Sequence, residues 1–306
     1  MKRYFLFFLT LAFAIVMNAQ ALYVGTYNIR NQNNDDLRDG NGWPTRSKVI
    51  CDMINFEQPA IFGTQEVLVG QLHDLLNGLD NYGYIGVGRE DGKEAGEYSA
   101  VFYKKDQLNL LGHGNFWLNE TPDVPKLGWD AACIRICTWG QFLDRRTKLK
   151  FFFFNLHMDH VGIVARREAA KLVIRKIKAI AKGAPVILTG DFNVDQRDEI
   201  FGIFSKSGIL KDSYTYTKQC FAENGTFNNF ENNLKSDSRI DHVFVSPNFN
   251  VEHYGILTNS YWTENAQTAT SAKKGHDAPD QINLSNYTRR NPSDHYPVFV
   301  KLVYKK

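Results

Sequence analysis

The chain has 306 residues, of which 43% are hydrophobic and 23% charged, and its formal net charge is +3. This balance predicts a globular protein with one large domain or two small ones, and no repeated period points to a repeat architecture. A charge so close to neutral provides no overall field that would attract a long polyanion. Nucleic acid could therefore bind only through a local basic patch.

Residues 1–21 have the pattern of a secretory signal peptide. Lys2 and Arg3 precede an apolar run at residues 5–17, and the small residues Ala19 and Ala21 on either side of Gln20 suit a cleavage site. The run is short for a membrane span, and no cysteine follows it that could carry a lipid. We expect a mature chain of residues 22–306 that is exported to the periplasm or secreted, lacks a membrane span and is monomeric.

The cysteines give no sign of a metal site. They are Cys51, Cys133, Cys137 and Cys220. Because the paired C-x-x-C spacing typical of zinc sites is missing, zinc is not expected. Export would permit a disulfide, and the sequence leaves disulfide-bonded and free thiols open.

In chain order, the first half alternates strands and helices. Strands are predicted at residues 22–28, 60–66, 82–88, 98–103 and 106–116, where short apolar runs are bounded by polar residues. Pro44 opens a helix at residues 43–56, since proline fits the first helical turn, and residues 68–79 form a second helix. Residues 31–42 and 89–96 are predicted to be polar loops.

In the second half, residues 133–142 and 150–157 are predicted to form an antiparallel strand pair. The clearest helix follows at residues 161–182, where Ala169, Val173, Ile177 and Ile180 recur with helical spacing and basic residues fill the other faces. Further strands are predicted at residues 185–193, 239–245, 251–257 and 295–303, with a helix at 198–206. Residues 263–292 are long and polar, and they form either an insertion loop or a lid near the site.

The chain is organised around residues 185–193, PVILTGDFN. Their apolar run predicts a strand covered on both faces, which delivers Asp191 and Asn193 to its carboxyl end. If the strand continues that far, the two side chains point the same way. A carboxylate can take a proton or bind a cation, and a carboxamide can donate and accept, so the pair suits phosphate-ester hydrolysis. The GDFN segment alone is also an ordinary strand-to-turn junction.

The order of elements predicts the architecture. Strands that pair as hairpins and then meet helices occur in each half of the chain. They predict an α/β (or α+β) sandwich of two mixed β-sheets packed face to face, with helices outside. Because no linker-like break separates the halves, residues 22–306 are expected to form one catalytic domain.

Other predicted strand ends carry groups that complement Asp191. Glu66, Asn28 and Asp294 offer the oxygen ligands that a hard divalent cation prefers, so Mg²⁺, or Mn²⁺ in its place, is the expected cofactor. Such an ion withdraws charge from a phosphoryl group and stabilises the leaving oxygen.

The remaining polar residues would carry out the chemistry. Asp191 would orient or deprotonate the attacking water, and Asn193 would hold that water or a phosphate oxygen. A protonated His295 would stabilise the charge of the transition state, with Asp241 as the partner that fixes its tautomer.

Each of these residues also has a structural interpretation. Glu66 could cap the helix at residues 68–79, and Asn28 could be a turn residue. Asp241 could pair with Arg239, and His157 could belong to a solvated turn. The joint pattern favours the catalytic interpretation, because chance does not readily place so many complementary groups at strand ends.

Six motifs in this order resemble the endonuclease/exonuclease/phosphatase superfamily, whose fold is that of deoxyribonuclease I. They are TYNIR (residues 26–30), TQEV (64–67), NLHMDH (155–160), TGDFN (189–193), SRIDHVFVS (238–246) and SDHYPV (293–298). The resemblance covers almost the whole mature chain. It implies a four-layered α/β sandwich and magnesium-dependent cleavage of phosphate esters, with Glu66 as the principal metal ligand. His157 is similar to a second histidine that contacts the scissile phosphate in several branches of the superfamily.

Residues 97–104, 115–123 and 128–139 resemble one exported bacterial branch. Arg135, in the last segment, would bind substrate by adding positive charge beside the phosphate, or it could point outward from its strand. Glu97 could pair with His157. Three tryptophans could either wall the substrate cleft or pack in the core, namely Trp117, Trp129 and Trp139.

We therefore expect an exported, magnesium-dependent phosphoesterase that uses water to hydrolyse a phosphate mono- or diester. A small phosphorylated metabolite or a lipid-derived ester is slightly favoured over nucleic acid, because the net charge is low. The alternative within the same class is a secreted nuclease. The alternative of another class is a secreted binding protein on a retired enzyme scaffold, which predicts losses among the metal and histidine positions.

Overall fold

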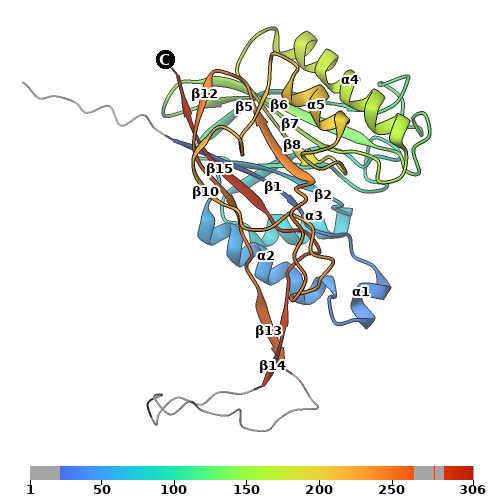
Figure 1. The fold of residues 1–306 in the computed structure, drawn as a ribbon, viewed down its shortest axis with the longest axis vertical. Helices are drawn as coiled ribbons and strands as arrows, with labels where there is room; N and C mark the ends of the chain where they lie inside the picture. The colour runs from blue at the N-terminus through green and yellow to red at the C-terminus, as the bar shows by residue number, and fades with distance from the viewer. Residues whose placement is uncertain (1–20, 265–278, 280–285, 306) are drawn as a thin grey trace, which may run out of the picture.

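The computed structural model describes residues 21–264, 279 and 286–305. The predicted signal peptide, apart from its last residue, lies outside these residues. Two large sheets face each other in the middle of the molecule, and helices cover the outer face of each (Figure 1). The predicted four-layered α/β sandwich with two mixed sheets is confirmed. Within the described residues, none of the helices combines the length and the apolar character needed to cross a membrane.

The first sheet has seven strands in the order β10-β12-β15-β1-β2-β4-β3. Their bounds are Leu22–Asn28 (β1), Ile61–Gln65 (β2), Tyr82–Ile85 (β3), Val101–Lys104 (β4), Thr217–Phe221 (β10), Phe249–Ile256 (β12) and Val298–Tyr304 (β15). Strands β1 and β2 are parallel, because helix α2 (Trp43–Glu57) carries the chain back between them. Helix α3 (Val69–Gly78) follows β2.

The second sheet has six strands in the order β5-β6-β7-β8-β11-β9. Their bounds are Leu108–Trp117 (β5), Ile136–Asp144 (β6), Lys150–His157 (β7), Val186–Asp191 (β8), Lys211–Asp212 (β9) and Asp241–Val245 (β11). Strands β6 and β7 are antiparallel, as predicted. Strands β7 and β8 are parallel and are connected through the long helix α4 (Ile163–Ala181). Helix α5 (Glu199–Ser205) lies beside α4 (Figure 1).

Three apolar clusters fill the spaces between the layers. Val24, Phe153 and Ile187 belong to the cluster between the two sheets. A second cluster packs α4 and α5 against the six-stranded sheet, and a third packs α2 and α3 against the seven-stranded sheet. The spacing predicted for α4 is confirmed: Ala169, Val173 and Ile177 are buried in its cluster, with Ile180 packed at the edge.

Toward one rim, the interface between the sheets becomes polar. Asn155 on β7 donates from Nδ2 to the carbonyl oxygens of Thr64 and Ala100 in the other sheet, at 2.8 and 3.0 Å. Its Oδ1 accepts from Gln65 Nε2 at 2.7 Å. This close approach requires glycine at Gly63, since a Cβ there would lie 2.1 Å from Asn155 Oδ1. Hydrogen bonds therefore fix the two sheets against each other where both end.

The structure differs from the predicted elements at several places. A short helix α1 (Asn34–Arg38) forms within residues 31–42, because Asn33 caps it by accepting from the backbone N–H of Asp36. Strands β9 and β10 were not predicted. The long polar segment at 263–292 begins and ends in an antiparallel hairpin, β13 (Tyr261–Glu264) with β14 (Tyr287–Arg290), and most of the segment between them lies outside the described residues.

Candidate active site

Strand pairing brings the predicted site residues to one rim. In the parallel pair β1–β2, Asn28 lies opposite Gln65, so Glu66 follows one residue beyond. In the other sheet, Asp191 lies between His157 on β7 and Asp241 on β11. A cavity of about 880 Å³ opens at this rim. Its lining includes Glu66, Arg135, His157, Asp191, Asn193, Asp294 and His295. Asn28 and Asp241 are fully buried behind it.

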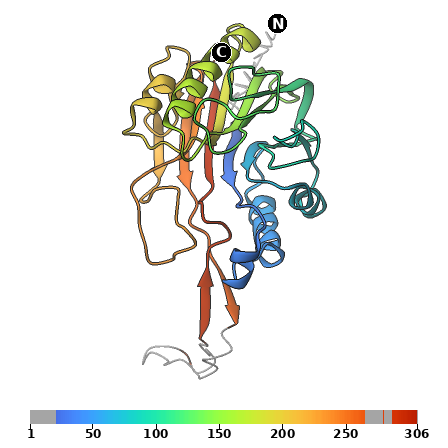
Figure 2. The same ribbon diagram turned by 90° about the vertical axis from the view of Figure 1, so that its right-hand side faces the viewer.

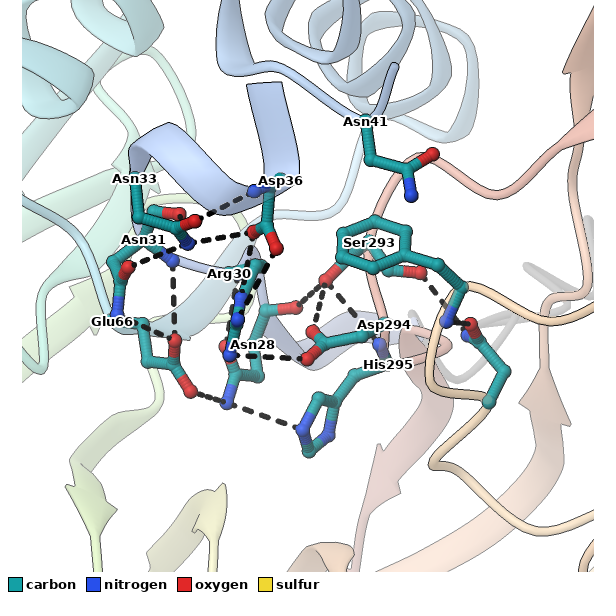
Figure 3. Close-up of polar contacts among 12 residues, drawn as sticks. Asn28, Arg30, Asn31, Asn33, Asp36, Asn41, Glu66, Ser293, Asp294 and His295 are labelled. Atoms are coloured by element: carbon teal, nitrogen blue, oxygen red, sulfur yellow. Dashed lines mark hydrogen bonds and ion pairs between the residues drawn. The ribbon is translucent and has the colours of Figure 1, made fainter. Parts of the chain in front are cut away.

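Asn28 connects the two sheets at the centre of the site. Its Nδ2 donates to Glu66 Oε1 at 2.9 Å and lies 3.4 Å from His295 Nε2 (Figure 3). The same Nδ2 also donates to Asp191 Oδ2 at 3.0 Å. Its Oδ1 accepts from the backbone N–H of Arg30 at 3.0 Å. Asn28, Glu66, Asp191, Asp241 and His295 are called the central cluster below.

Glu66 is held by two asparagines. It follows β2 in a left-handed backbone conformation, with φ at 62°, which turns the side chain away from the strand direction. Its Oε2 accepts from the backbone N–H and the Nδ2 of Asn31, each at 3.1 Å. Burial favours the neutral acid, but the hydrogen bond from Asn28 and the charge of His295 outweigh it and lower the pKa of Glu66. Glu66 does not cap α3, where Leu68 is the N-cap residue.

Asp241 and His295 form a buried pair. His295 Nδ1 lies 2.8 Å from Asp241 Oδ2, and the backbone N–H of His295 donates to Ser293 Oγ at 3.3 Å. Burial opposes a charged imidazole, but Asp241 and then Asp191 outweigh it and raise the pKa of His295 well above its ordinary value. The alternative partner, Arg239, pairs with Asp212 at 3.2 Å instead.

Asp191 is a carboxyl group that can exchange a proton near neutral pH. Burial, followed by the charge of Asp241, raises the pKa of Asp191 to about 7. Its Oδ2 lies 3.8 Å from His295 Nε2, and its Oδ1 accepts from the backbone N–H of Asn193 at 3.0 Å. Such a group can serve as a general base.

Asn193 reaches the cavity in a different way from the one predicted. Strand β8 ends at Asp191, so strand alternation does not orient Asn193. Its backbone is left-handed, with φ at 50°, and its Nδ2 donates to the carbonyl oxygen of Met158 at 2.9 Å. The turn residue still lines the cavity, because its amide is tied to the end of β7.

His157 is buried at the end of β7, so the solvated-turn interpretation is wrong. Its Nε2 lies 3.5 Å from Asp191 Oδ2, and its Nδ1 has no hydrogen-bond partner among the described residues. Burial, followed by the charges of Arg135 and Arg89, lowers the pKa of His157 well below its ordinary value. Glu97, which the sequence offered as one option for a partner of His157, binds Arg89 instead.

Arg135 points into the cavity, so the outward orientation is wrong. It precedes β6, and its Nε lies 3.3 Å from Asp159 Oδ2 while its Nη2 lies 2.9 Å from His160 Nδ1. Asp159 also accepts from four backbone N–H groups, those of Ala132, Cys133, Val161 and Gly162. The carboxylate therefore anchors the loop that presents the guanidinium.

Sequence reasoning missed many polar residues of this cavity, and four of them form ion pairs or hydrogen bonds close to the predicted site residues. They are Arg30, Asn31, Asp36 and Arg89. Arg30 bridges Asp36 at 2.8 Å and Asp294 at 3.5 Å. Arg89 pairs with Glu97 at 2.5 Å, and Asn31 joins Glu97 to Glu66. Arg30 is the last residue of the TYNIR motif and Asn31 is the next residue, so the position of that motif was a usable signal. Arg89 lies in a loop that gives no periodic signal.

The tryptophans lie outside the cavity, and the cysteines are unpaired. None of the three tryptophans lines the cavity. Trp117 donates from Nε1 to the carbonyl oxygen of Arg89 at 2.7 Å, and Trp129 and Trp139 pack against an apolar cluster. All four cysteines are free thiols.

The donor set fits a hard divalent cation. Glu66 and Asp294 place two carboxylates on the cavity wall, and burial, with the nearby charge of Glu66, raises the pKa of Asp294. A cation between them would relieve this repulsion, and oxygen donors suit Mg²⁺. Because Asn28 turns its amide nitrogen toward Glu66, it orients that carboxylate in this arrangement. The ligand roles of Glu66, Asn28 and Asp294 stay a prediction.

Two other groups of potential ligands come close together among the described residues. Asp191, Asp241 and His295 form the first group, and the hydrogen bonds and opposite charges of these residues explain why they lie together. Cys133, Asp159 and His160 form the other, but Asp159 already accepts from four backbone N–H groups. The oxygens of Asp159 therefore already hold the loop together through these hydrogen bonds.

Comparisons with known proteins agree with this geometry. The family model described as Endonuclease/Exonuclease/phosphatase family matches residues 25–295. A structure of a family protein from Bacteroides thetaiotaomicron is 47% identical with a TM-score of 0.86, covering 94% of this chain and 98% of that chain. A mannosyl-6-phosphatase from Bacteroides thetaiotaomicron VPI-5482 is also 47% identical, with a TM-score of 0.85, covering 92% of this chain and 100% of that chain.

A more distant relative comes from a virus. An uncharacterized protein of Acanthamoeba polyphaga mimivirus is 28% identical over 236 residues, which is 72% of this chain and 87% of the viral protein. The family model spans every predicted site residue, from Asn28 to His295. The chain therefore belongs to the endonuclease/exonuclease/phosphatase family, whose members hydrolyse phosphate esters.

Proposed function

We propose that the protein is an exported, divalent-metal-dependent phosphatase that hydrolyses a phosphate monoester of a sugar or a similar small hydroxylated metabolite. One observation carries the proposal: a buried carboxylate and a buried imidazole meet inside a cavity that also holds guanidinium groups. Asp191 Oδ2 lies 3.8 Å from His295 Nε2, and Arg89 and Arg135 line the same cavity.

In the proposed reaction, Asp191 accepts a proton from the attacking water. Burial and the charge of Asp241 raise the pKa of Asp191 to about 7. A general base works best when its pKa lies near the pH of the solution, so Asp191 is suited to neutral pH. Asn28 and the backbone N–H of Asn193 hold the carboxylate in place, at 3.0 Å each. The water therefore meets an oriented base.

His295 stabilises the negative charge that develops in the transition state. Asp241 holds the ring at 2.8 Å and keeps its pKa raised against the effect of burial, so the imidazole stays protonated at neutral pH. A fixed positive charge in a buried site costs no reorganisation during the reaction. Replacing His295 removes this charge and leaves Asp241 without its partner.

Arg135 and Arg89 would bind the terminal phosphate oxygens. A guanidinium matches phosphate geometry with paired N–H donors. Both arginines lie close enough to His157 that their charges, together with burial, lower the pKa of that histidine. A monoester phosphate carries more charge than a diester and offers more terminal oxygens, so a cationic wall favours it.

Glu66 and Asp294 would hold the divalent cation, with Asn28 orienting Glu66. When bound, that ion withdraws charge from the phosphoryl group and stabilises the leaving oxygen.

Similarity to a characterised protein supports the substrate class. The 47% identical structure over 92% of this chain is a mannosyl-6-phosphatase. The signal-peptide pattern of residues 1–21 supports export, and fractionation of cells that express the full chain checks it.

The test uses residues 22–306 with Mg²⁺, with Mn²⁺ or with EDTA. Phosphate release is measured from p-nitrophenyl phosphate, mannose 6-phosphate, glucose 6-phosphate and inositol phosphates, and nitrophenol release from bis(p-nitrophenyl) phosphate. We expect metal-dependent release from a sugar monoester and slow hydrolysis of the diester. His295→Ala should lower the rate by at least about a hundredfold, whereas the exposed His253→Ala serves as the matched control.

Three outcomes oppose the proposal. Cleavage confined to DNA or RNA in zymograms would identify a nuclease. Hydrolysis of the diester as fast as the monoester would remove the preference attributed to Arg89 and Arg135. No hydrolysis under any metal condition would favour the binding protein on an enzyme scaffold.

A further inference from the structure

The cavity extends well beyond the residues that handle phosphate. Its volume of about 880 Å³ lies near the upper end of the roughly 300–1,000 Å³ typical of ligand pockets, and a single phosphorylated sugar would fill only part of it. The rest of the lining begins at Phe227, beside His295, and continues with Asn229, Asn232 and Arg289 on one side and with Asp39 and Asn41 on the other. These six residues are called the outer wall.

The outer wall is attached directly to the residues that carry the site. The backbone N–H groups of Asn228 and Asn229 donate to the carbonyl oxygen of Asp294 at 2.7 and 3.1 Å. Asn228 Nδ2 also donates to the carbonyl oxygen of Ser293 at 3.1 Å. The loop that carries Phe227 and Asn229 therefore has a defined position relative to His295.

The two sides of the outer wall are tied together by Arg290. Its Nη1 donates to the Asp39 carbonyl oxygen at 3.0 Å and to Asn41 Oδ1 at 2.9 Å, while its Nε donates to Thr263 Oγ1 at 3.0 Å. Asn232 Nδ2 donates to the Arg289 carbonyl oxygen at 2.5 Å. The hairpin of β13 and β14 projects from the rim (Figure 2), and these bonds hold its base against the segment after α1.

The chemistry of the outer wall suits sugar rings. Phe227 is 41% exposed, and its ring lies 5.1 Å from the His295 ring, so it offers an apolar surface next to the reacting centre for the C–H face of a pyranose. Farther out, the side chains of Asn229, Arg289 and Asp39 provide donors and acceptors for hydroxyl groups.

The same surface does not suit a nucleic-acid strand. Single-stranded nucleic acid needs a basic groove with successive stacking rings. Here Asp39 and Glu231 place carboxylates in the lining beside Arg289 and Arg290, so the surface is mixed in charge and not uniformly basic. A neutral chain of sugars needs no basic groove and can form hydrogen bonds with both kinds of group.

We propose that the outer wall is a binding site for an oligosaccharide, so that the enzyme removes phosphate from a sugar at the end of a glycan chain in preference to a free sugar phosphate. The inference rests on the proposed phosphatase function. The terminal phosphorylated sugar packs on Phe227, and the following sugars contact Asn229, Arg289 and Asp39. Contacts away from the reacting phosphate raise kcat/KM when they help to position the substrate.

The test compares kcat/KM for mannose 6-phosphate and for a mannotriose that carries the 6-phosphate on its non-reducing terminal sugar, with p-nitrophenyl phosphate as a reference. We expect the trisaccharide to be hydrolysed with at least a tenfold higher kcat/KM. Unphosphorylated mannotriose should inhibit the reaction more strongly than mannose does, because it still occupies the outer wall.

Variants locate the effect. Arg289→Ala should lower kcat/KM for the trisaccharide about tenfold and for mannose 6-phosphate much less, which reduces the ratio of the two. Phe227→Ala should lower both, because its ring lies next to His295. Arg145→Ala, an exposed arginine outside the cavity, is the matched control and should leave the ratio at the wild-type value.

Equal kcat/KM for the two mannosyl phosphates would overturn the inference, and so would an Arg289→Ala variant with the wild-type ratio. Hydrolysis of p-nitrophenyl phosphate without hydrolysis of either mannosyl phosphate would also overturn it while the phosphatase function stands. If none of the three substrates is hydrolysed with any metal, the proposed function fails and the inference fails with it.

Discussion

The central cluster sits where hydrogen-bonded strands end, whereas the outer wall consists of loop segments and the base of a hairpin. Asn28, Asp191 and Asp241 occupy paired positions in the two large sheets, and an apolar core lies directly behind them. Phe227, Asn232 and Arg289 belong to no large sheet. The difference separates two tasks: rigid strands hold groups that must meet within hydrogen-bond distance, and loops supply a surface that can vary with the substrate.

The largest effect is expected in the central cluster. Asp191→Asn keeps the size of the side chain but removes the proton acceptor, so kcat should fall about a thousandfold. Rates with p-nitrophenyl phosphate, which needs no sugar contacts, should fall as much as rates with a sugar phosphate. A loss seen only with the sugar phosphate would place Asp191 in substrate binding and break the distinction between the two regions.

The next effect tests the metal site within the same cluster. Glu66→Gln removes one buried negative charge, so we expect kcat/KM at low Mg²⁺ to fall about a hundredfold, with partial recovery at high Mg²⁺. Binding of Mn²⁺, followed by electron paramagnetic resonance, should weaken in parallel. Glu223→Gln, at an exposed glutamate outside the cavity, is the matched control. An activity loss that added metal does not change would show that Glu66 was assigned wrongly.

A third variant cuts the connection between the two regions. Asn228 is buried, and its side chain joins Ser293, Phe230 and Asn291 at 3.1, 2.8 and 3.0 Å. Asn228→Ala leaves these buried partners without hydrogen bonds, which should cost about 1–3 kcal/mol of stability in urea unfolding. Among folded molecules, p-nitrophenyl phosphate hydrolysis should fall less than hydrolysis of a sugar phosphate. Equal losses of both activities would mean that the outer wall and the central cluster act as one unit.

The smallest effect on activity is expected at a buried residue that influences fold stability and takes no part in the chemistry. His242 follows Asp241 on β11 and faces Phe192 and Phe201 instead of the cavity. Burial lowers its pKa to about 4, while the unfolded chain binds that proton near the ordinary value of about 6.5. Between these values the unfolded state binds more protons, so stability should fall as pH decreases, by at most about 1.4 kcal/mol per pH unit.

The measurement is the free energy of unfolding in urea at pH values from 4 to 7. His242→Gln should flatten the pH dependence relative to the wild type, and the exposed His253→Gln should leave it as it is. An equally steep pH dependence in His242→Gln would assign the proton uptake to other groups, such as the buried carboxyls of the site.

Most of the fold could be predicted because burial leaves a pattern in the sequence. The apolar runs of β1, β2 and β8 and the spacing of α4 follow from which faces must meet the core. Helix α1 could not be predicted from periodicity, because it has one turn and depends on the cap from Asn33. The hairpin of β13 and β14 was not predicted for a similar reason, since its strands are short and mostly polar.

The identity of the central residues could be predicted, but several of their partners could not. Their positions at strand ends, together with six motifs in order, identified Asp191, Asp241 and His295. The sequence offered His157 as a partner for Glu97, and the structure pairs Glu97 with Arg89. Strand alternation was expected to orient the Asn193 side chain, whereas in the structure a left-handed turn orients it.

By itself, the sequence determined the order of layers and the kinds of donor and acceptor available at the rim, because apolar periodicity and side-chain chemistry are properties of each segment alone. Only the tertiary structure decided which polar groups meet. A hydrogen bond forms within about 3 Å and depends on direction, so small differences in where β8 ends or how the Arg89 loop turns decide the partner. The same limit explains why the outer wall, assembled from three distant segments, became visible only in the folded chain.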